Sequence, residues 1–94
     1  MAEVRIPTIL RPYTDGERAV TATGSTVAEL IDNLEANHEG IKERLLDGAD
    51  VRRFVNIYVN DEDIRFTGGL QTAVADAATV VILPAVAGGA GESR

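Results

Sequence analysis

The clearest pattern of hydrophobic and polar positions predicts a helix over residues 24–40. Its apolar side chains recur at i, i+3, i+4 and i+7, which gathers them into one stripe; they are Val27, Leu30, Ile31 and Leu34. Thr26 and Glu29 fit a capping box at the start, with Ser25 as an alternative N-cap. Gly40 supplies the expected end of the helix.

A second pattern, alternation with a period of two, predicts strands. Over residues 53–61 one face carries Val55, Ile57 and Val59, and the other carries Phe54, Asn56 and Tyr58. Residues 4–10 and 18–23 are rich in β-branched side chains and predict two further strands. Asp15-Gly16 between them predicts a hairpin turn. Pro7 indicates an edge or a bulge in the first strand, because it has no N–H to donate.

The remaining elements complete a recognisable order. The continuous apolar run at residues 79–84 predicts a central strand that is buried on at least one face. Other expected elements are a loop at 48–53, a turn at 60–63, a short strand at 64–66, and single helical turns at 41–47 and 70–74.

This order predicts an α+β domain with a β-grasp arrangement. Two strands, a helix and three further strands would give a mixed sheet of about five strands, with one main helix packed across it. We expect the domain and its C-terminal arm to span residues 1–87.

Size, composition and charge exclude several classes of protein. The 94 residues suit one domain. The net charge of −6 argues against a nucleic-acid partner, because phosphates favour basic surfaces. No apolar run approaches the roughly 20 residues of a membrane span, and the first residues do not resemble a signal peptide. The chain lacks cysteine, which excludes disulfides, and we expect a cytoplasmic protein. A monomer is the default expectation for its oligomeric state.

Residues that carry chemistry elsewhere do not form a catalytic site here. His38 is the only histidine and lies near the expected helix end, which is typical of a solvated residue. The acidic residues 61–63 lack the spacing of a calcium loop and predict a solvated turn. Arg52 and Arg53 are typical of an exposed strand entry. We therefore expect no catalytic residue, no metal site and no bound cofactor, and hence a protein that is not an enzyme.

The C-terminal residues are the most distinctive feature of the sequence. Gly88 and Gly89 follow the last predicted strand and have no side chains, so they are thin and flexible. Pro84, Ala85, Val86 and Ala87 would form an arm that enters a partner protein. A terminal glycine carboxylate is a poor electrophile, and a partner would have to activate it with ATP before it accepted a nucleophile.

Four stretches resemble the ThiS/MoaD family of ubiquitin-like sulfur carriers, and most closely its CysO-type members. These are IPTILRPYT at 6–14, STVAELIDNLEAN at 25–37, RFVNIYVNDEDIRF at 53–66 and TVVILPAVAGG at 79–89. The resemblance implies that an E1-like enzyme of the ThiF/MoeB type, using ATP and Mg²⁺, adenylates the Gly89 carboxylate. Sulfur then replaces AMP, and the resulting thiocarboxylate serves a sulfur-accepting synthase, such as a PLP-dependent cysteine synthase.

The resemblance also implies a docking face. Similarity to ubiquitin favours Val81 and Leu83 as outward residues, beside Tyr58 and Phe54. Alternation along the same strand would place Val80 and Ile82 on its other side.

The sequence departs from the family at residues 90–94, because an active carrier ends in Gly-Gly. We expect a protease, of the JAMM zinc type in this family, to remove this tail. Two alternatives stay open: a β-grasp interaction subunit that carries no sulfur, and a ubiquitin-like modifier joined to lysines of target proteins. Lys42 is the only lysine of the chain, so chains linked through lysine would have one site.

Overall fold

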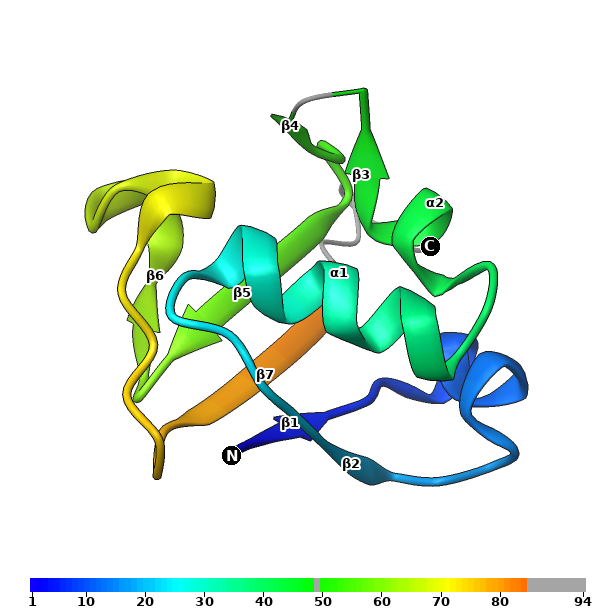
Figure 1. Cartoon of the computed structure of the whole chain (residues 1–94). Coiled ribbons are helices and arrows are strands. Elements are labelled where there is room, and N and C mark those ends of the chain that lie inside the picture. Colours follow the sequence, from blue (N-terminus) through cyan, green and yellow to red (C-terminus); the bar gives the residue numbers. More distant parts are fainter. Residues whose placement is uncertain (49, 85–94) are drawn as a thin grey trace.

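A five-stranded mixed sheet with one long helix across it forms the body of the protein (Figure 1). The computed structural model describes residues 1–48 and 50–84. The strand order is β2-β1-β7-β5-β6, and β1 and β7 run parallel while the other neighbours are antiparallel. The strands are β1 Ala2–Arg5, β2 Ala19–Ala22, β5 Val55–Val59, β6 Glu62–Asp63 and β7 Thr79–Pro84. This topology confirms the predicted β-grasp sheet and the central place of β7.

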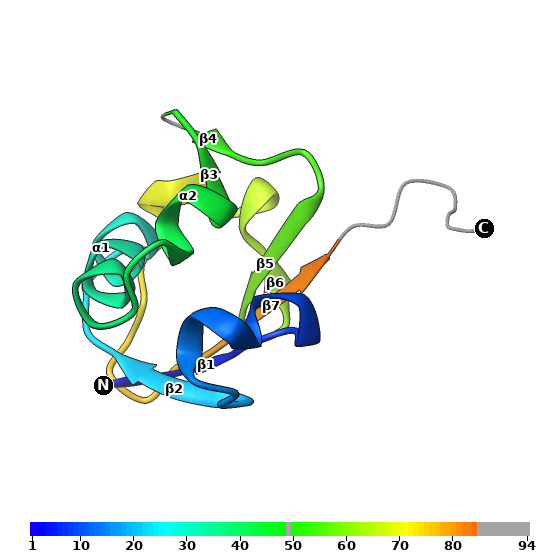
Figure 2. The same cartoon turned by 90° about the vertical axis from the view of Figure 1, so that its right-hand side faces the viewer.

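Helix α1, Val27–Asn37, lies across one side of the sheet (Figure 2). Its apolar stripe is buried as predicted. Thr26 is the N-cap: its Oγ1 accepts a hydrogen bond from the Glu29 backbone N–H at 3.3 Å. The Glu29 carboxylate in turn accepts from the backbone N–H of Ser25 at 2.9 Å. Ser25 is therefore held by the cap and is not itself the cap.

The short helix α2, Ile41–Leu45, follows at once and confirms the predicted helical turn. Gly40 precedes it with φ +98°, and the Glu35 carboxylate accepts from the backbone N–H groups of Gly40 and Lys42 at 3.0 and 2.9 Å. These two bonds satisfy donors that the first turn of a helix leaves unpaired. Glu35 thus joins the end of α1 to the start of α2.

The first predicted strand is shorter than expected. Strand β1 ends at Arg5, and residues 8–14 form a 3-10 helix, η1 (Thr8–Thr14). The Ile6 N–H still bonds across the sheet to the Arg18 carbonyl at 2.7 Å, but Pro7 has no N–H with which to continue. Beyond it the chain bonds locally, and the Leu10 N–H donates to the Pro7 carbonyl at 2.9 Å. The β1–β2 hairpin is confirmed. Asp15-Gly16 forms the predicted turn, because the Glu17 N–H donates to the Thr14 carbonyl at 3.0 Å and both residues have positive φ, but η1 separates this turn from β1.

Four further expectations need correction. The predicted turn at 60–63 is shorter, because its last two residues form strand β6. Residues 64–66 form a 3-10 turn, η2 (Ile64–Phe66), and not a strand, because the Asp63 side chain accepts from the Arg65 N–H at 2.9 Å and closes the turn. The expected loop at 48–53 contains strand β4, Asp50–Val51, which pairs with β3, Leu46–Asp47. Leu46 and Val51 both pack against the core, which brings these segments together. The late helical turn is η3, Gly69–Gln71, shorter than predicted.

The core lies between α1 and the sheet. It contains the buried side chains of Val4, Leu30, Ile31, Leu34, Ile57, Val80 and Ile82, among others. Within the described residues, no helix has both the length and the apolar character that crossing a membrane requires.

Candidate docking face and C-terminal exit

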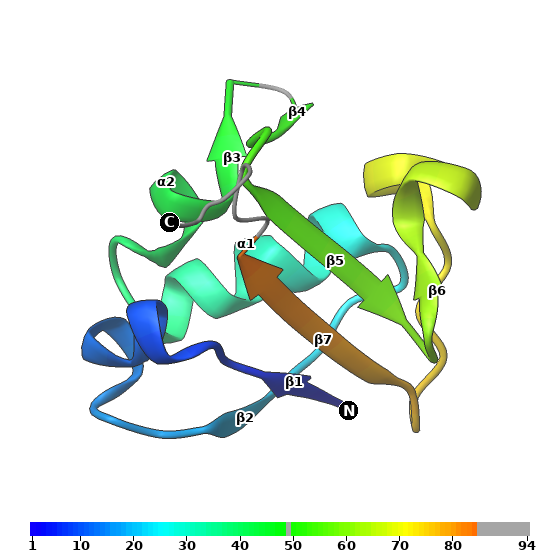
Figure 3. The ribbon, with the colours of Figure 1, turned by 180° about the vertical axis from the view of Figure 1, so that it is seen from behind.

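Strand β7 fixes the point from which the C-terminal residues leave the domain. It lies between β1 on one side and β5 on the other (Figure 3). Pro84 lies opposite Val55 in the last register of the β5–β7 pair. A strand bonded on both sides cannot slide without breaking two ladders. The register of β7 is therefore fixed over residues 79–81, and at its end Pro84 is paired with β5 alone.

The two faces of β7 differ as predicted. Val80 and Ile82 are 1% and 2% exposed and belong to the core, whereas Leu83 is 45% exposed and Val81 is half-buried. Val81 lies directly opposite Tyr58 on β5. The face that carries Val81, Leu83 and Tyr58 is the one turned away from α1, which Figure 3 shows facing the viewer.

Phe54 lies at the edge of this face and extends it into a groove. The side chain is 61% exposed and precedes the first residue of β5. The groove opens where η1, α2 and the ends of β5 and β7 meet, and its volume is about 480 Å³. We call it the exit groove and define it by Ile9, Tyr13, Arg44, Arg52, Phe54 and Leu83. Pro84 also lines it.

The sequence alone did not indicate Ile9, Tyr13 or Arg44 as site residues. Tyr13 joins η1 to α2, because its hydroxyl accepts a hydrogen bond from Arg44 Nε at 2.6 Å. The guanidinium of Arg44 also lies 5.6 Å from the centroid of the Tyr13 ring, within the range of a cation–π contact. A long-range contact of this kind leaves no periodic signal in the sequence.

A second groove flanks β7 on its other side. Its lining includes Arg5, Arg11 and Arg18 together with Val81, Leu83 and Pro84. No Asp or Glu of the described residues lines either groove, although the whole chain carries a net charge of −6. The surface around Pro84 is therefore apolar and basic on a protein that is acidic overall.

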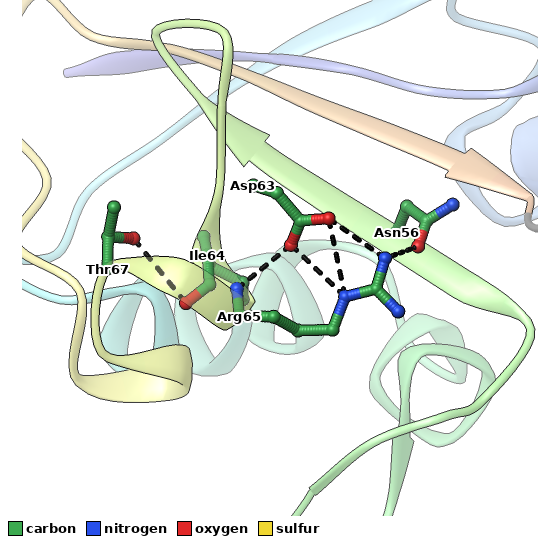
Figure 4. Close-up of polar contacts among 5 residues, drawn as sticks. All are labelled: Asn56, Asp63, Ile64, Arg65 and Thr67. Carbon is green, nitrogen blue, oxygen red and sulfur yellow. Dashed lines mark hydrogen bonds and ion pairs between the residues drawn. The ribbon is translucent and has the colours of Figure 1, made fainter.

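Two of the other residues singled out from the sequence, Asp63 and Arg52, have side-chain partners. Figure 4 shows Asp63 in an ion pair with Arg65 at 2.8 Å, and Arg65 also donates to the side-chain oxygen of Asn56. The hydrogen bonds from Arg65 hold the pKa of the Asp63 carboxyl below its ordinary value. Arg52 donates through Nε to the Glu43 carbonyl at 2.8 Å. In the described parts of the chain, no cluster of three potential metal ligands occurs.

The predicted reactive end lies outside the described residues. This holds for Gly88 and Gly89, for Ala85, Val86 and Ala87 of the predicted arm, and for the tail at 90–94. Their roles remain predictions.

Comparisons with known proteins agree with the sheet topology. The ThiS family model matches residues 4–89. The sulfur carrier protein CysO of Mycobacterium tuberculosis is 61% identical over 89 residues, which cover 92% of this chain and 96% of the relative. Small archaeal modifier protein 3 of Haloferax volcanii is 34% identical over 65 residues, 69% of this chain and 71% of the relative.

A solved structure shows the same similarity to CysO. A chain in the crystal structure of the Amycolatopsis orientalis BexX/CysO complex superposes with a TM-score of 0.91 at 56% identity, covering 95% of this chain and all of that one. The likeness to named sulfur carrier proteins agrees with the prediction of a carrier and not a catalyst. Both the fold and the match over residues 4–89 show that this chain belongs to the ThiS family.

Proposed function

We propose that this protein is a sulfur carrier whose Gly89 carboxyl group becomes a thiocarboxylate. One observation carries the proposal: the family match runs through the arm and stops at the second glycine of the Gly88-Gly89 pair. The fixed register of β7 supports it, because a thin C-terminal arm that follows a firmly held strand can present its end inside another protein. The 61% identity to a named sulfur carrier supports it further.

The chemistry would take place in partner enzymes. An E1-like enzyme of the ThiF/MoeB type would bind ATP and Mg²⁺, and the Gly89 carboxylate would attack the α-phosphorus of ATP and release pyrophosphate. A sulfur nucleophile would then attack the acyl carbon and expel AMP, leaving the thiocarboxylate. This chain would bind no cofactor of its own. Its contribution is the docking surface, the arm of Pro84, Ala85, Val86 and Ala87, and the small residue Gly88, which leaves space around the reacting carbonyl.

The thiocarboxylate would then serve a sulfur-accepting synthase. Its ionised sulfur is a better nucleophile than the carboxylate oxygen that it replaces, so it can attack an activated acceptor in the synthase. A cysteine synthase is one candidate, and other sulfur-incorporating synthases are further ones. That a CysO relative was crystallised in a complex with BexX supports the existence of such a partner.

In the sequence as written, the Gly89 carboxyl group is part of a peptide bond to Ala90. We propose that a JAMM-type zinc protease removes residues 90–94 before activation. Incubating the full chain with extract of the host cell should release these five residues. A zinc chelator should prevent the release, and a full chain that is adenylated without cleavage would contradict this step.

Adenylation is tested with two versions of the chain. A chain that ends at Gly89, mixed with the activating enzyme, ATP and Mg²⁺, should exchange labelled pyrophosphate into ATP. The full chain should not, because it has no free Gly89 carboxylate. A chain ending at Gly89 that supports no exchange with any ThiF/MoeB-type enzyme of its host would favour an interaction subunit that carries no sulfur.

A second candidate function is that of a protein modifier. The similarity to small archaeal modifier protein 3 favours it. In this case the activated Gly89 carbonyl would be attacked by a lysine amine of a target, giving an isopeptide bond. Conjugates that survive both thiols and boiling in SDS would support this function, since a thioester would be cleaved by the thiol.

A further inference from the structure

The exit groove brings together the exposed apolar side chains of this domain. Five large hydrophobic side chains are exposed among the described residues, and three of them line this groove: Ile9 at 65%, Phe54 at 61% and Leu83 at 45%. They come from η1, from the segment before β5 and from β7, so no single element explains their exposure. Contiguous exposed apolar surface of this kind marks an interaction site more often than isolated residues do.

Two arginines at the groove are already oriented by the fold. Arg44 is held through Nε by the Tyr13 hydroxyl, and Arg52 is held through Nε by the Glu43 carbonyl. In the described part of the chain neither guanidinium forms an ion pair with a carboxylate. Such a pre-oriented guanidinium can still bind a carboxylate through its terminal amino groups, with little loss of side-chain entropy.

The charge around Pro84 continues on the other side of β7. Arg5, Arg11 and Arg18 line the second groove, so the two grooves together contain five of the nine Lys and Arg residues of the chain. Glu3 pairs with Arg5 at 3.3 Å but does not line the groove. Pro84 lines both grooves, so a protein that binds around Pro84 meets both basic surfaces.

We propose that the exit groove binds a segment of a partner protein that presents a large apolar side chain flanked by carboxylates. The apolar side chain fills the space between Ile9, Phe54 and Leu83, and the carboxylates pair with Arg44 and Arg52. This rests on the proposed function, in which the partner first met is the activating enzyme. It goes beyond docking on the open sheet face, because the groove lies at the edge of that face and includes η1 and α2.

The test measures the rate of activation as a function of carrier concentration, which gives kcat and the KM for the carrier. A chain ending at Gly89 is assayed with the ThiF/MoeB-type enzyme of its host by ATP-dependent pyrophosphate exchange. The double variant R44Q/R52Q should raise the KM for the carrier roughly tenfold and leave kcat nearly unchanged, because these arginines bind the partner and do not contact the reacting atoms. Its kcat/KM should also depend less on salt concentration than that of the unaltered chain.

Matched variants separate this surface from net charge and from hydrophobicity in general. K42Q/R53Q also removes two positive charges, but from residues that line neither groove, and it should leave KM within about twofold. Phe54→Ala should raise KM, whereas Phe66→Ala, which truncates an exposed side chain outside both grooves, should not. Circular dichroism and urea unfolding confirm that each variant is folded.

Several outcomes would overturn the proposal. A KM that R44Q/R52Q leaves unchanged, or raises no more than K42Q/R53Q does, excludes the groove as the docking site. If the unaltered chain is not activated, the proposed function fails. The groove is then tested separately by calorimetry, which measures binding to the same enzyme without ATP. If R44Q/R52Q binds as tightly as the unaltered chain, the groove proposal is rejected.

Two other occupants of the groove have their own signatures. If the NMR signals of Ile9, Phe54 and Leu83 differ between chains ending at Pro84 and at Gly89, the occupant is the protein's own arm. Concentration-dependent association in sedimentation that R44Q/R52Q abolishes indicates a second copy. The proposal expects neither result, and either one would overturn it.

Discussion

Val81 on β7 lies directly opposite Tyr58 on β5, on the face of the sheet that α1 does not cover. The neighbours of Val81 on either side, Val80 and Ile82, are buried in the core. One strand therefore stabilises the domain with every second residue and carries the others on the opposite face, which we propose as the docking face. Substitutions at adjacent positions of β7 should consequently affect different properties.

Ile82 and Leu83 test this division of roles. Ile82→Ala should lower the free energy of unfolding by about 2–5 kcal/mol, because it leaves a cavity in the core. Leu83→Ala should change it much less, by about 0.5–1 kcal/mol, since nearly half of Leu83 is already exposed, and should instead weaken binding to the activating enzyme. Urea unfolding and a binding titration of both variants check the prediction. Equal losses of stability would contradict the assignment of the two faces.

Gly24 is required by the close approach of the chain to α1. A Cβ at this position would lie 2.5 Å from the backbone nitrogen of Leu30 and 2.8 Å from the carbonyl carbon of Glu29, neither of which can move freely. Gly24→Ala should therefore destabilise the protein by about 1–3 kcal/mol through steric overlap, in addition to any backbone strain.

Gly16→Ala is the matched control, because Gly16 has φ +83° and a Cβ added there would meet no other atom within 4 Å. It should show only the backbone strain, about 1 kcal/mol. Chemical denaturation of both variants gives the comparison, and a Gly24→Ala variant as stable as Gly16→Ala would show that the helix start can shift without loss.

Thr26 and Ser25 distinguish the two possible caps of α1. Thr26→Ala should lower stability by about 1 kcal/mol, because the Glu29 N–H loses its partner. Ser25→Ala should change it by less than about 0.5 kcal/mol, since the backbone N–H of Ser25, and not its side chain, takes part. Thermal and urea unfolding measure both. The opposite order of effects would place the helix start one residue earlier.

Glu35 should make stability depend on pH. The backbone N–H groups of Gly40 and Lys42 donate to its carboxylate and hold its pKa below the ordinary value of 4.5. Because the folded pKa is the lower one, this stabilisation is complete above pH 4.5 and is lost as the pH falls through the folded pKa. The stability difference between the unaltered protein and Glu35→Gln should thus be largest near neutral pH and shrink in acid.

Glu39→Gln is the control for this pH series. This substitution also removes one negative charge, four residues further along the chain. The Glu39 side chain accepts no hydrogen bond from the described residues. Urea midpoints measured between about pH 3 and pH 7 would follow both variants. A gap for Glu35→Gln that stays constant over the whole range would contradict the proposed role of the charge.

The hydrophobic pattern correctly predicted the elements whose apolar residues keep a single periodicity from end to end. The stripe of α1 and the alternation of β5 and β7 each repeat over several turns or pairs, and each has the predicted buried face. The 3-10 helix η1 was missed because Thr8, Ile9 and Leu10 suit a strand by composition. The strand ends instead at Pro7, which has no N–H to donate to the neighbouring strand. This effect depends on the position of the neighbouring strand, which the local sequence does not give.

The candidate site was predictable only in part. Alternation was sufficient to place Val81 and Leu83 outward, because they belong to one strand. The exit groove depends on a contact between Tyr13 and Arg44, which are 31 residues apart in the sequence. Both residues also line the groove together with the end of β7. No local period contains such a contact, so it follows only from the assembled fold.

The central claim is that Gly89 becomes the sulfur-bearing end of this protein. Intact-mass spectrometry tests it most directly, on the full chain incubated with host cell extract, ATP and sulfide. We predict the loss of residues 90–94, followed by the mass gain of replacing one oxygen by sulfur. A chain that loses these residues but never gains sulfur, or that stays unchanged, would contradict the sulfur-carrier account.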